Sequence, residues 1–254
     1  MLRRIKNLIV NKFPIASRKI YHIVNRFVFK GDKYYCPICE KSFSKFLPGP
    51  GRIKKNVKCP GCSSLERHRL LWLYLKNKLN IITSKTALLS VAPEYSIQRK
   101  LKSLNNIDYS SIDLDSKLAM YKVDLTNIPF EDNKYDGIIC YHVLEHIADD
   151  LKAMSELFRI LKPGGWAILQ SPVDNNREET YEDFSITSSI ERKNVFGQED
   201  HVRIYGRDYT SRLMKAGFSV KEDPFVNAFS EDEVETFKLD RSELIYFCTK
   251  QMII

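Results

Sequence analysis

The fold of this chain is decided by residues 135–172, YDGIICYHVLEHIADDLKAMSELFRILKPGGWAILQSP. This stretch opens with an apolar run of strand length, residues 135–143, and closes with a second, residues 164–172. Between them, apolar residues recur at the spacing of one helical face, and a proline followed by two glycines marks the helix end. The apolar residues are Leu151, Met154, Leu157, Phe158 and Leu161. A strand, a crossover helix and a second strand predict parallel neighbours in a covered sheet.

The same alternation continues on both sides of this stretch. Further strands are predicted at residues 86–92, 109–114 and 121–125 upstream and at 218–225 and 242–249 downstream, with a helix at 206–218. The last two strands are expected to pair at the sheet edge. The pattern predicts an α/β fold, a Rossmann-like, doubly wound, mostly parallel sheet of seven strands, with ligands at the carboxyl ends of the strands.

The net charge is concentrated at the amino end of the chain. The 254 residues carry a formal charge of +8, but residues 1–30 hold eight basic residues and no acidic one, and the remaining 224 are balanced at 32 of each sign. The charge therefore describes a basic arm rather than the body of the protein. With 43% hydrophobic residues the chain can fill the core of an ordinary domain, so a disordered or fibrous protein is not expected.

The arm, residues 1–30, has the pattern of an amphipathic helix divided by Pro14. Apolar residues at helical spacing occur as Ile5, Leu8 and Ile9 and again as Ile20, Ile23, Val24 and Phe27. No segment has the features of a signal peptide or the length of a transmembrane helix, so we expect a cytoplasmic protein. A basic amphipathic helix can lie on an anionic membrane, which makes peripheral membrane contact one expectation; packing on the body or a solvated end is the other.

Four of the six cysteines form two CxxC pairs, Cys36 with Cys39 and Cys59 with Cys62. Two such knuckles close a tetrahedral sulfur site, the geometry of structural Zn(II), with iron as the main competitor. Gly61 is expected to supply a positive φ, and the segment between the pairs is expected to form the hairpin of a zinc ribbon. Disulfides are disfavoured in a cytoplasmic protein. Cys140 and Cys248 lie in apolar strand patterns and are expected in the core.

A helix is predicted directly after the second knuckle, at residues 63–79, with Ser63 or Ser64 as its cap. Its first turns carry Arg67, His68 and Arg69, which form either a solvated helix end or an anion site. We expect three parts: the arm at 1–30, a zinc ribbon at 31–66 and the α/β domain at 67–254.

From about residue 86 onward the chain resembles class I S-adenosylmethionine-dependent methyltransferases of the type 11-like group. Five motifs in order carry the resemblance: Asp113 closing the second strand, Asp124–Phe130, Tyr135–Asp136, the Leu-Glu-His-Ile turn after the fourth strand, and Arg159–Gly165. With the upstream cysteine pairs and the Ser-Leu-Glu-Arg-His-Arg-Leu helix, the chain is similar to a bacterial subgroup of these enzymes. The resemblance implies the methyltransferase fold and S-adenosylmethionine as cofactor.

The resemblance also implies roles for residues at the strand ends. Asp113, with Asp115 as the alternative, would accept hydrogen bonds from both ribose hydroxyls; Asp124 would accept from the adenine amino group, and Leu125 would pack on the ring. Either aspartate can instead cap the segment that follows its strand.

The first loop departs from the family pattern, because Ala92, Pro93 and Glu94 stand where relatives have Gly-x-Gly. S-adenosylmethionine has no phosphate that would require bare backbone. We expect Ala92 to let the chain turn near the ligand, Pro93 to fix the turn and Glu94 to accept from the cofactor ammonium group. Tyr95 or Tyr141 would face the sulfonium ion.

Histidines are the candidate bases for methyl transfer to a hydroxyl or an amine, which must lose a proton. His142, His146 and His201 are the candidates. His142, Glu145 and His146 have the spacing of one helical turn, so a divalent metal is an alternative to a base or a capping role. In quinone-biosynthesis O-methyltransferases, carboxylates and a histidine on the similar turn hold a divalent ion, but here the first position is a histidine.

Residues 173–205 form a long polar connection over the expected site, typical of a lid, although a disordered loop is the alternative. Its residues Asp174, Phe196, His201, Arg203 and Tyr205 are candidates to touch the acceptor.

The sequence thus favours a methyltransferase for a small molecule or a glycan precursor. Residues 31–69 hold nine basic and three acidic residues, so an RNA methyltransferase that grips RNA with the ribbon and arm is an alternative. A non-catalytic cofactor-binding scaffold is another.

Overall fold

The computed structural model describes residues 14–49 and 54–252, with side chains from residue 20 onward. The first thirteen residues of the predicted arm, with Ile5, Leu8 and Ile9, lie outside the described residues. The chain folds into two compact units: residues 1–80 with 225–243, and residues 81–224 with 244–254. We call them the cysteine unit and the sheet unit. Within the described ranges, none of the helices has the length and apolar character needed to cross a membrane.

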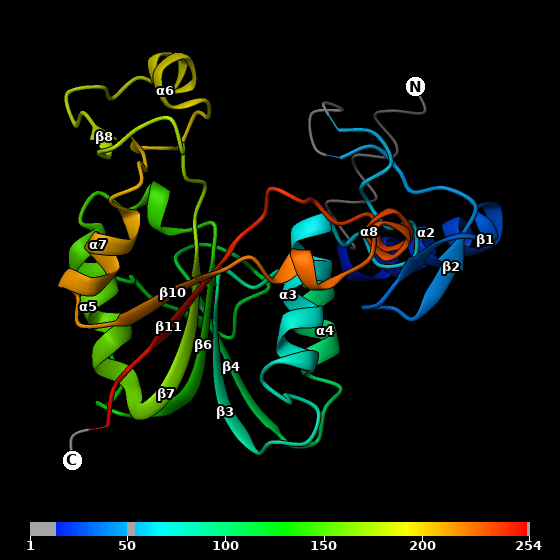
Figure 1. Cartoon of the computed structure of the whole chain (residues 1–254), viewed down its shortest axis with the longest axis horizontal. Coiled ribbons are helices and arrows are strands. Elements are labelled where there is room, and N and C mark those ends of the chain that lie inside the picture. Colours follow the sequence, from blue (N-terminus) through cyan, green and yellow to red (C-terminus); the bar gives the residue numbers. More distant parts are fainter. Residues whose placement is uncertain (1–13, 50–53, 253–254) are drawn as a thin grey trace. The chain divides into compact units, whose positions relative to one another are not determined.

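The sheet unit contains the predicted seven-stranded sheet, in the order β10-β11-β7-β6-β3-β4-β5 (Figure 1). Parallel pairing joins β5, β4, β3, β6 and β7, and β11 runs antiparallel to both β7 and β10. The last two strands therefore do pair at the sheet edge. The bounds are β3 (Thr86–Val91), β4 (Ile107–Asp113), β5 (Tyr121–Lys122), β6 (Tyr135–Tyr141), β7 (Leu161–Gln170), β10 (Ser219–Asp223) and β11 (Ile245–Thr249).

Helices cover both faces of this sheet, α4 (Tyr95–Leu101) on one and α5 (Asp150–Ile160) with α7 (Tyr209–Lys215) on the other (Figure 1). The Asp149 side chain caps α5 by accepting a hydrogen bond from the Lys152 amide at 3.0 Å. Buried residues at helical spacing, including Met154, Leu157 and Ile160, fill the core below the strands. The predicted doubly wound α/β architecture is thus confirmed.

The stretch at residues 135–172 differs from the prediction in one element boundary and in the burial of one residue. The helix ends at Ile160, and Leu161 already begins β7, so Pro163 and the two glycines lie inside the strand rather than before it. Leu151, placed on the apolar stripe by its spacing, is 37% exposed. Both differences arise at helix ends, where the sequence period alone does not fix the boundary.

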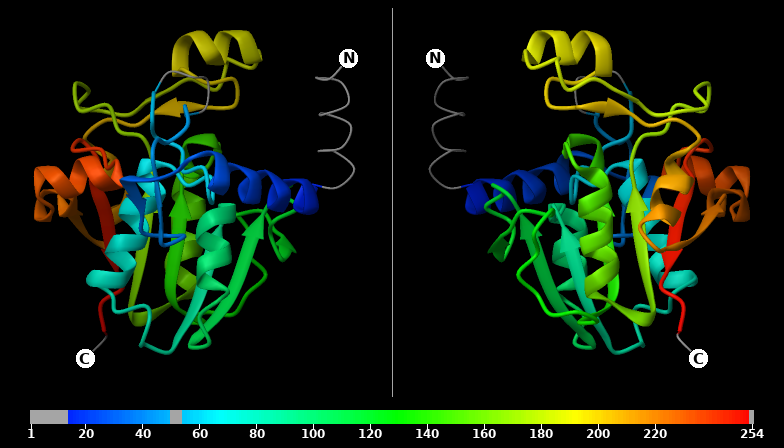
Figure 2. Two further views of the ribbon diagram at one scale, coloured as in Figure 1. Left: turned by 90° about the vertical axis from the view of Figure 1, so that its right-hand side faces the viewer. Right: turned by 90° about the vertical axis from the view of Figure 1, so that its left-hand side faces the viewer.

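The segment between β7 and α7 is ordered rather than an irregular loop. It contains β8 (Tyr181–Glu182), α6 (Ser189–Phe196) and β9 (Arg203–Ile204), with β8 and β9 paired antiparallel. The segment carrying α6 lies beyond the carboxyl ends of the parallel strands (Figure 2). This is the position expected for a lid.

The cysteine unit combines α2 (Pro14–Val28), β1 (Lys30–Cys36), β2 (Lys41–Phe43) and α3 (Glu66–Asn77) with η3 (Phe225–Ala228) and α8 (Glu231–Phe237). The predicted division at residue 66 differs from this arrangement, because α3 and residues 225–243 belong to the cysteine unit. This grouping is difficult to predict from the sequence, because residues 225–243 lie between β10 and β11 in the chain but pack in the cysteine unit.

One expectation about the cysteine segment is confirmed in part and one is wrong. Between the knuckles, Leu47 and Lys58 form an antiparallel bridge with backbone hydrogen bonds in both directions, as in a short hairpin, and a second hairpin pairs β1 with β2 around the first knuckle. Gly61 does not have a positive φ; a Cβ there would lie 2.7 Å from the Phe43 ring, so the glycine is required for space. The positive φ values occur one residue after each pair, at Glu40 and Ser63.

The cap of α3 also differs from the prediction. Leu65 is the N-cap residue, and its amide donates to Nδ1 of His68 at 3.2 Å, which replaces the expected serine cap. Arg69 is fully buried and donates to the carbonyl oxygens of Ser64, Phe237 and Lys238. Its guanidinium group is therefore committed to the backbone and does not form an anion site. These bonds tie residues 225–243 to the cysteine segment.

Candidate functional site

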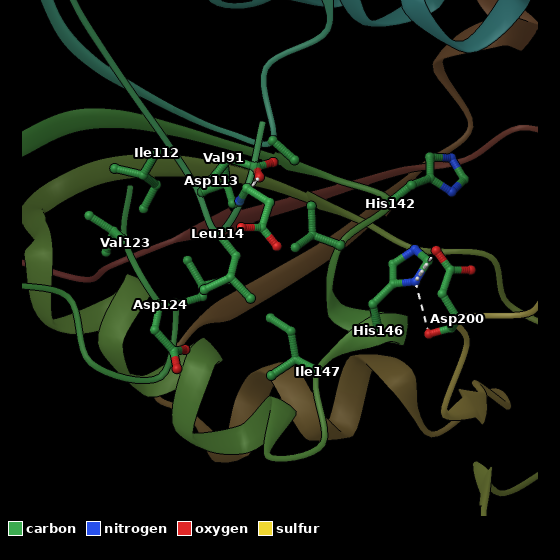
Figure 3. A pocket seen from close by; sticks show the side chains of 14 residues that line it. Val91, Ile112, Asp113, Leu114, Val123, Asp124, His142, His146, Ile147 and Asp200 are labelled. Atoms are coloured by element: carbon green, nitrogen blue, oxygen red, sulfur yellow. Dashed lines mark hydrogen bonds and ion pairs between the residues drawn. The ribbon is translucent and has the colours of Figure 1, made fainter. Parts of the chain in front are cut away.

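A pocket of about 550 Å³ opens at the carboxyl ends of the parallel strands of the sheet unit. Its volume lies within the ~300–1,000 Å³ typical of small-molecule sites. Four predicted cofactor-binding residues line it, together with two candidate bases (Figure 3). These are Ala92, Asp113, Asp124, Leu125, His142 and His146, joined by Asp115. Because the parallel strands end at one edge, residues far apart in the sequence meet here.

Asp113 and Asp124 each use one carboxylate oxygen to hold their own turn. Oδ1 of Asp113 accepts from the amides of Asp115 and Ser116 at 2.7 and 2.6 Å. Oδ1 of Asp124 accepts from both the amide and the hydroxyl of Thr126 at 2.8 Å. The capping role and the ligand role are therefore compatible, because one oxygen fixes the turn and each carboxylate keeps a second oxygen as an acceptor. Asp115 is highly exposed and pairs with Lys122 at 3.1 Å.

Ala92 occupies the turn between β3 and α4 with φ +47°, in the left-handed region that favours glycine. Its amide donates to the Ile112 carbonyl at 2.9 Å, which keeps the loop against the end of β4. The loop thus adopts a glycine-like turn with alanine. Pro93, Glu94 and Tyr141 do not line the pocket: Pro93 and Tyr141 are buried, and Glu94 is the exposed N-cap residue of α4.

His146 lines the pocket, and the groups around its Nδ1 atom indicate which tautomer its ring adopts. Its Nδ1 lies 3.2 Å from the Asp200 carbonyl oxygen and 3.4 Å from Asp200 Oδ2 (Figure 3). Both partners are acceptors, so the neutral ring carries its proton on Nδ1 and leaves the Nε2 lone pair available. The ring of His201 packs edge-on against it, with ring centroids 4.7 Å apart.

His201 is buried and does not line the pocket. Burial lowers the pKa of His201, and the neighbouring charge of His146 lowers it further. His201 packs against the His146 ring and supports it rather than meeting an acceptor directly.

His142 stands at the end of β6 with φ +56° and contacts the buried Glu145, with Nδ1 3.3 Å from Oε1. Glu145 also accepts from the Ser171 hydroxyl at 2.9 Å. Burial raises the pKa of Glu145, but the His142 hydrogen bond and charge outweigh this and hold it below its usual value. Among the described residues, Nε2 of His142 has no hydrogen-bond partner.

A metal-binding geometry exists here for a different trio from the one suggested by sequence spacing. Ligand atoms of Glu145, His146 and His201 all lie within 4.8 Å of one another. His142 contacts Glu145 but is not one of the three residues, so the spacing of one helical turn does not predict which residues form the cluster. The 3-10 helix η2 (Leu144–His146) supplies two members, and residue 201 is brought in from the lid segment.

Three of the residues considered as acceptor contacts have structural roles. Arg203 has a fully buried side chain and donates to the carbonyls of Leu144, Ile147 and Ala148 and to Glu182. Tyr205 is buried and donates to Asp150 at 2.7 Å. Phe196 is buried as well. Arg203 and Tyr205 thus hold the lid segment to the turn after β6 and to the start of α5, and Phe196 packs against Tyr181 within the lid segment.

Several pocket residues were missed by the sequence reasoning. They are Val91, Ile112, Leu114, Val123, Val143, Ile147 and Asp200. The apolar residues flank the predicted aspartates and histidines at the strand ends. The alternation of side chains along each strand could have identified them as pocket residues. Asp200 directly precedes His201 in the sequence, but nothing in the lid pattern distinguished it from other acidic residues.

The four paired cysteines come together in the cysteine unit, with Cys36 Sγ 3.6 Å from Cys62 Sγ and Cys39 Sγ 3.7 Å from Cys59 Sγ. All four sulfur atoms lie within 4.8 Å of one another, and none forms a disulfide. A tetrahedral zinc ion with ~2.3 Å bonds to sulfur separates its ligands by about 3.8 Å, so the donor set fits this ion. Cys140 and Cys248 are buried, as expected, and burial raises the pKa of both thiols.

Comparisons with known proteins agree with this geometry. Residues 90–169 match the family model described as a methyltransferase domain. An uncharacterized protein of Methanocaldococcus jannaschii is 34% identical over 91 residues, covering 31% of this chain and 40% of its own. A probable S-adenosylmethionine-dependent methyltransferase of Mycolicibacterium smegmatis is 29% identical over 122 residues, covering 46% of this chain and 43% of that protein. The chain thus spans less than half the length of these relatives.

A solved structure, that of the [4+2]-cyclase SpnF, has the same fold. The similarity has a TM-score of 0.51 at 14% identity and covers 82% of this chain and 88% of that one. The strand order and the matched family model therefore show that residues 90–169 are similar to a methyltransferase domain and that the sheet unit has the fold of the class I S-adenosylmethionine-dependent methyltransferases. The cofactor of this class is S-adenosylmethionine.

Proposed function

We propose that the protein transfers a methyl group from S-adenosylmethionine to a small molecule or a glycan precursor, and that a zinc ion bound by the four paired cysteines is structural. The main support for this proposal is the pocket at the strand ends, which is lined by Asp113, Asp124 and His146. Asp113 would hold the ribose and Asp124 the adenine, each through the oxygen that its own turn does not use.

The bound cofactor supplies a methyl group on a positively charged sulfur, which makes the carbon open to in-line displacement. The residues of the chain have three tasks: to align the acceptor, to exclude water and to accept the acceptor's proton. We assign the last task to Nε2 of His146, because Asp200 fixes the proton on Nδ1. As the acceptor takes the methyl group, Nε2 of His146 would accept the proton that the acceptor loses.

The charge of the cysteine segment gives less support to RNA as the acceptor. Of its nine basic residues, Arg69 is buried on backbone carbonyls, and Lys54 contacts Glu66 and Asp240 at 3.0 and 2.7 Å. These side chains are already occupied within the unit. RNA binding remains an outcome that the experiment below distinguishes.

Calorimetry with S-adenosylmethionine tests the proposal with a matched pair of variants. Asp113→Asn is expected to weaken binding about 10- to 100-fold, since hydrogen bonding to a charged acceptor, worth about 1.5–3 kcal/mol, is lost. Asp115→Asn, two residues away and paired with Lys122, is expected to leave it within about twofold. No measurable binding by the wild-type protein would contradict the proposal. Binding without turnover on any hydroxyl or amine acceptor would favour a scaffold, and turnover on RNA alone would favour the RNA enzyme.

A further inference from the structure

The described part of the arm, α2, is amphipathic in the opposite sense to an ordinary surface helix. Its packed face is polar: His22 is buried with Nε2 2.9 Å from the Ser63 hydroxyl, and Arg26 donates to the Gly61 carbonyl at 3.3 Å. Both contacts fall on the second cysteine knuckle and its following residue. A surface helix normally buries its apolar stripe and exposes its polar one.

The outward face of α2 is a continuous apolar stripe, made by Ile20, Ile23, Val24, Phe27 and Val28. These positions follow the i, i+3, i+4, i+7 and i+8 spacing of one helical face, roughly opposite to His22 and Arg26. Each is more than half exposed, and Phe27 reaches 78%. The packing of the helix therefore leaves its hydrophobic side to an external partner.

The charge around this stripe indicates what the partner is. Residues 1–30 carry eight basic residues and no acidic one, and residues 31–69 add nine basic against three acidic, of which Lys54 and Arg69 already have partners within the unit. A protein surface complementary to such a stripe would supply apolar side chains but no reason for the excess of positive charge. An anionic bilayer supplies both an apolar layer and negative headgroups.

We propose that α2 docks the protein on an anionic phospholipid surface, with Ile20, Ile23, Val24 and Phe27 entering the headgroup region and the net positive charge of residues 1–30 attracting the anionic headgroups. Attachment through His22 and Arg26 then holds the cysteine unit against the membrane. The interaction is peripheral and salt-sensitive, because one short helix and screened charges supply it.

Vesicle sedimentation of the full-length, zinc-loaded protein tests this. Vesicles of phosphatidylcholine with 30% phosphatidylglycerol are compared with pure phosphatidylcholine vesicles. We expect at least tenfold tighter binding to the anionic vesicles, weakened by raising the salt concentration. The double variant Ile23→Glu with Phe27→Glu should lose at least tenfold of this binding, and Arg18→Gln with Lys19→Gln should lose part of it.

The matched control is Ile190→Glu, because Ile190 is 74% exposed on α6 of the sheet unit. It is expected to bind vesicles as the wild type does. An unchanged zinc content and unfolding midpoint confirm that the α2 variants fold. The conservative variant Phe27→Leu, which keeps an apolar side chain, should bind the anionic vesicles as the wild type does.

Other occupants give different results. A wild-type protein that ignores anionic vesicles, or variants that bind as well as the wild type, would overturn the proposal. So would a dimer in light scattering that the Glu variants dissociate without any vesicle binding, because the stripe would then cover a second copy. If the wild type and the Glu variants bind RNA equally and neither binds vesicles, the basic residues of this region serve to bind nucleic acid rather than a membrane.

Discussion

Ala92 is the residue on which the shape of the cofactor loop depends. Left-handed backbone costs an L-residue about 1–2 kcal/mol, and this alanine adopts φ +47° while lining the pocket. The amide bond to Ile112 holds the turn in place. The loop therefore keeps the backbone path that glycine would allow and adds a single methyl group at the pocket wall.

A substitution pair at this position separates backbone strain from pocket space. Ala92→Gly relieves the strain but adds about 0.5–1 kcal/mol of chain entropy, so we expect unfolding free energy within about 1 kcal/mol of wild type and cofactor binding at least as tight. Ala92→Val keeps the strain and adds bulk, so binding should weaken at least tenfold. Urea unfolding and calorimetry measure both effects. Equal affinity of the glycine and valine variants would show that the loop does not approach the cofactor.

His201 links pH to the stability of the sheet unit. Its pKa is lowered by burial and by His146, so below the ordinary value of about 6.5 the unfolded chain binds a proton that the folded chain resists. Stability is therefore expected to fall as the pH falls through that region. In His201→Gln this contribution disappears, and the loss of unfolding free energy between pH 7.5 and 5.5 should be smaller than in wild type. Urea titrations at the two pH values, with a chelator present, measure it; an unchanged slope would contradict the assignment.

At the scale of elements, the turn after β6 is held by the lid segment rather than by its own sequence. The 3-10 helix η2 is three residues long, and its terminal carbonyls receive Arg203 from β9. Asp150 at the start of α5 receives both Tyr205 and Arg212. The His146 position is therefore set by residues more than fifty positions away in the chain.

Removing Arg203 tests this dependence. Arg203→Met leaves the buried carbonyls of the turn without their donor and removes the closest partner of Glu182, which costs about 3–5 kcal/mol of unfolding free energy; Asp150 keeps Tyr205 and Arg212. Arg207→Met, the control, removes an exposed ion pair to Glu178 and should cost less than about 1 kcal/mol. Chemical unfolding gives both values. A cost for Arg203→Met similar to that of the control would mean that other contacts hold the turn.

The sequence predicted the elements of the sheet and the residues at strand ends, because alternation and the strand-end rule are local signals. It did not predict contacts made by long-range packing. Arg159 illustrates this: its guanidinium donates to the carbonyls of Ile128 and Phe130, which links two of the five recognised motifs structurally. Arg203 was expected at the acceptor because it is polar and in the lid, yet it is buried, since its donors satisfy backbone carbonyls.

At the scale of the whole molecule, the chain forms a discontinuous cysteine unit. Residues 225–243 leave the sheet unit between β10 and β11 and join α3 and the cysteine knuckles. Their capping box at Ser230 and Glu233 starts α8, and Tyr35 and Phe237 pack with ring centroids 6.0 Å apart. No sequence period indicates this return, so the expected division at residue 66 differs from the two compact units.

Metal removal tests the coupling within this unit. We expect one zinc ion per chain by elemental analysis, and a chelator under reducing conditions should raise hydrogen exchange in residues 31–49 and 225–243 together, because Arg69 joins the cysteine segment to Phe237 and Lys238. Exchange in β3 and β6 and the affinity for S-adenosylmethionine should change less than about twofold, since those residues belong to the sheet unit.

Arg69→Met separates the metal from the coupling. With the four cysteines intact, this variant should retain zinc while exchange rises in residues 225–243 alone, because the carbonyls of Phe237 and Lys238 lose their donor. If elemental analysis finds no zinc in the purified protein, the proposed structural role of the metal is wrong. Exchange that rises on chelation in residues 31–49 but not in 225–243 would instead show that the two segments are stabilised separately, with the buried guanidinium too weak a link to make them one cooperative unit.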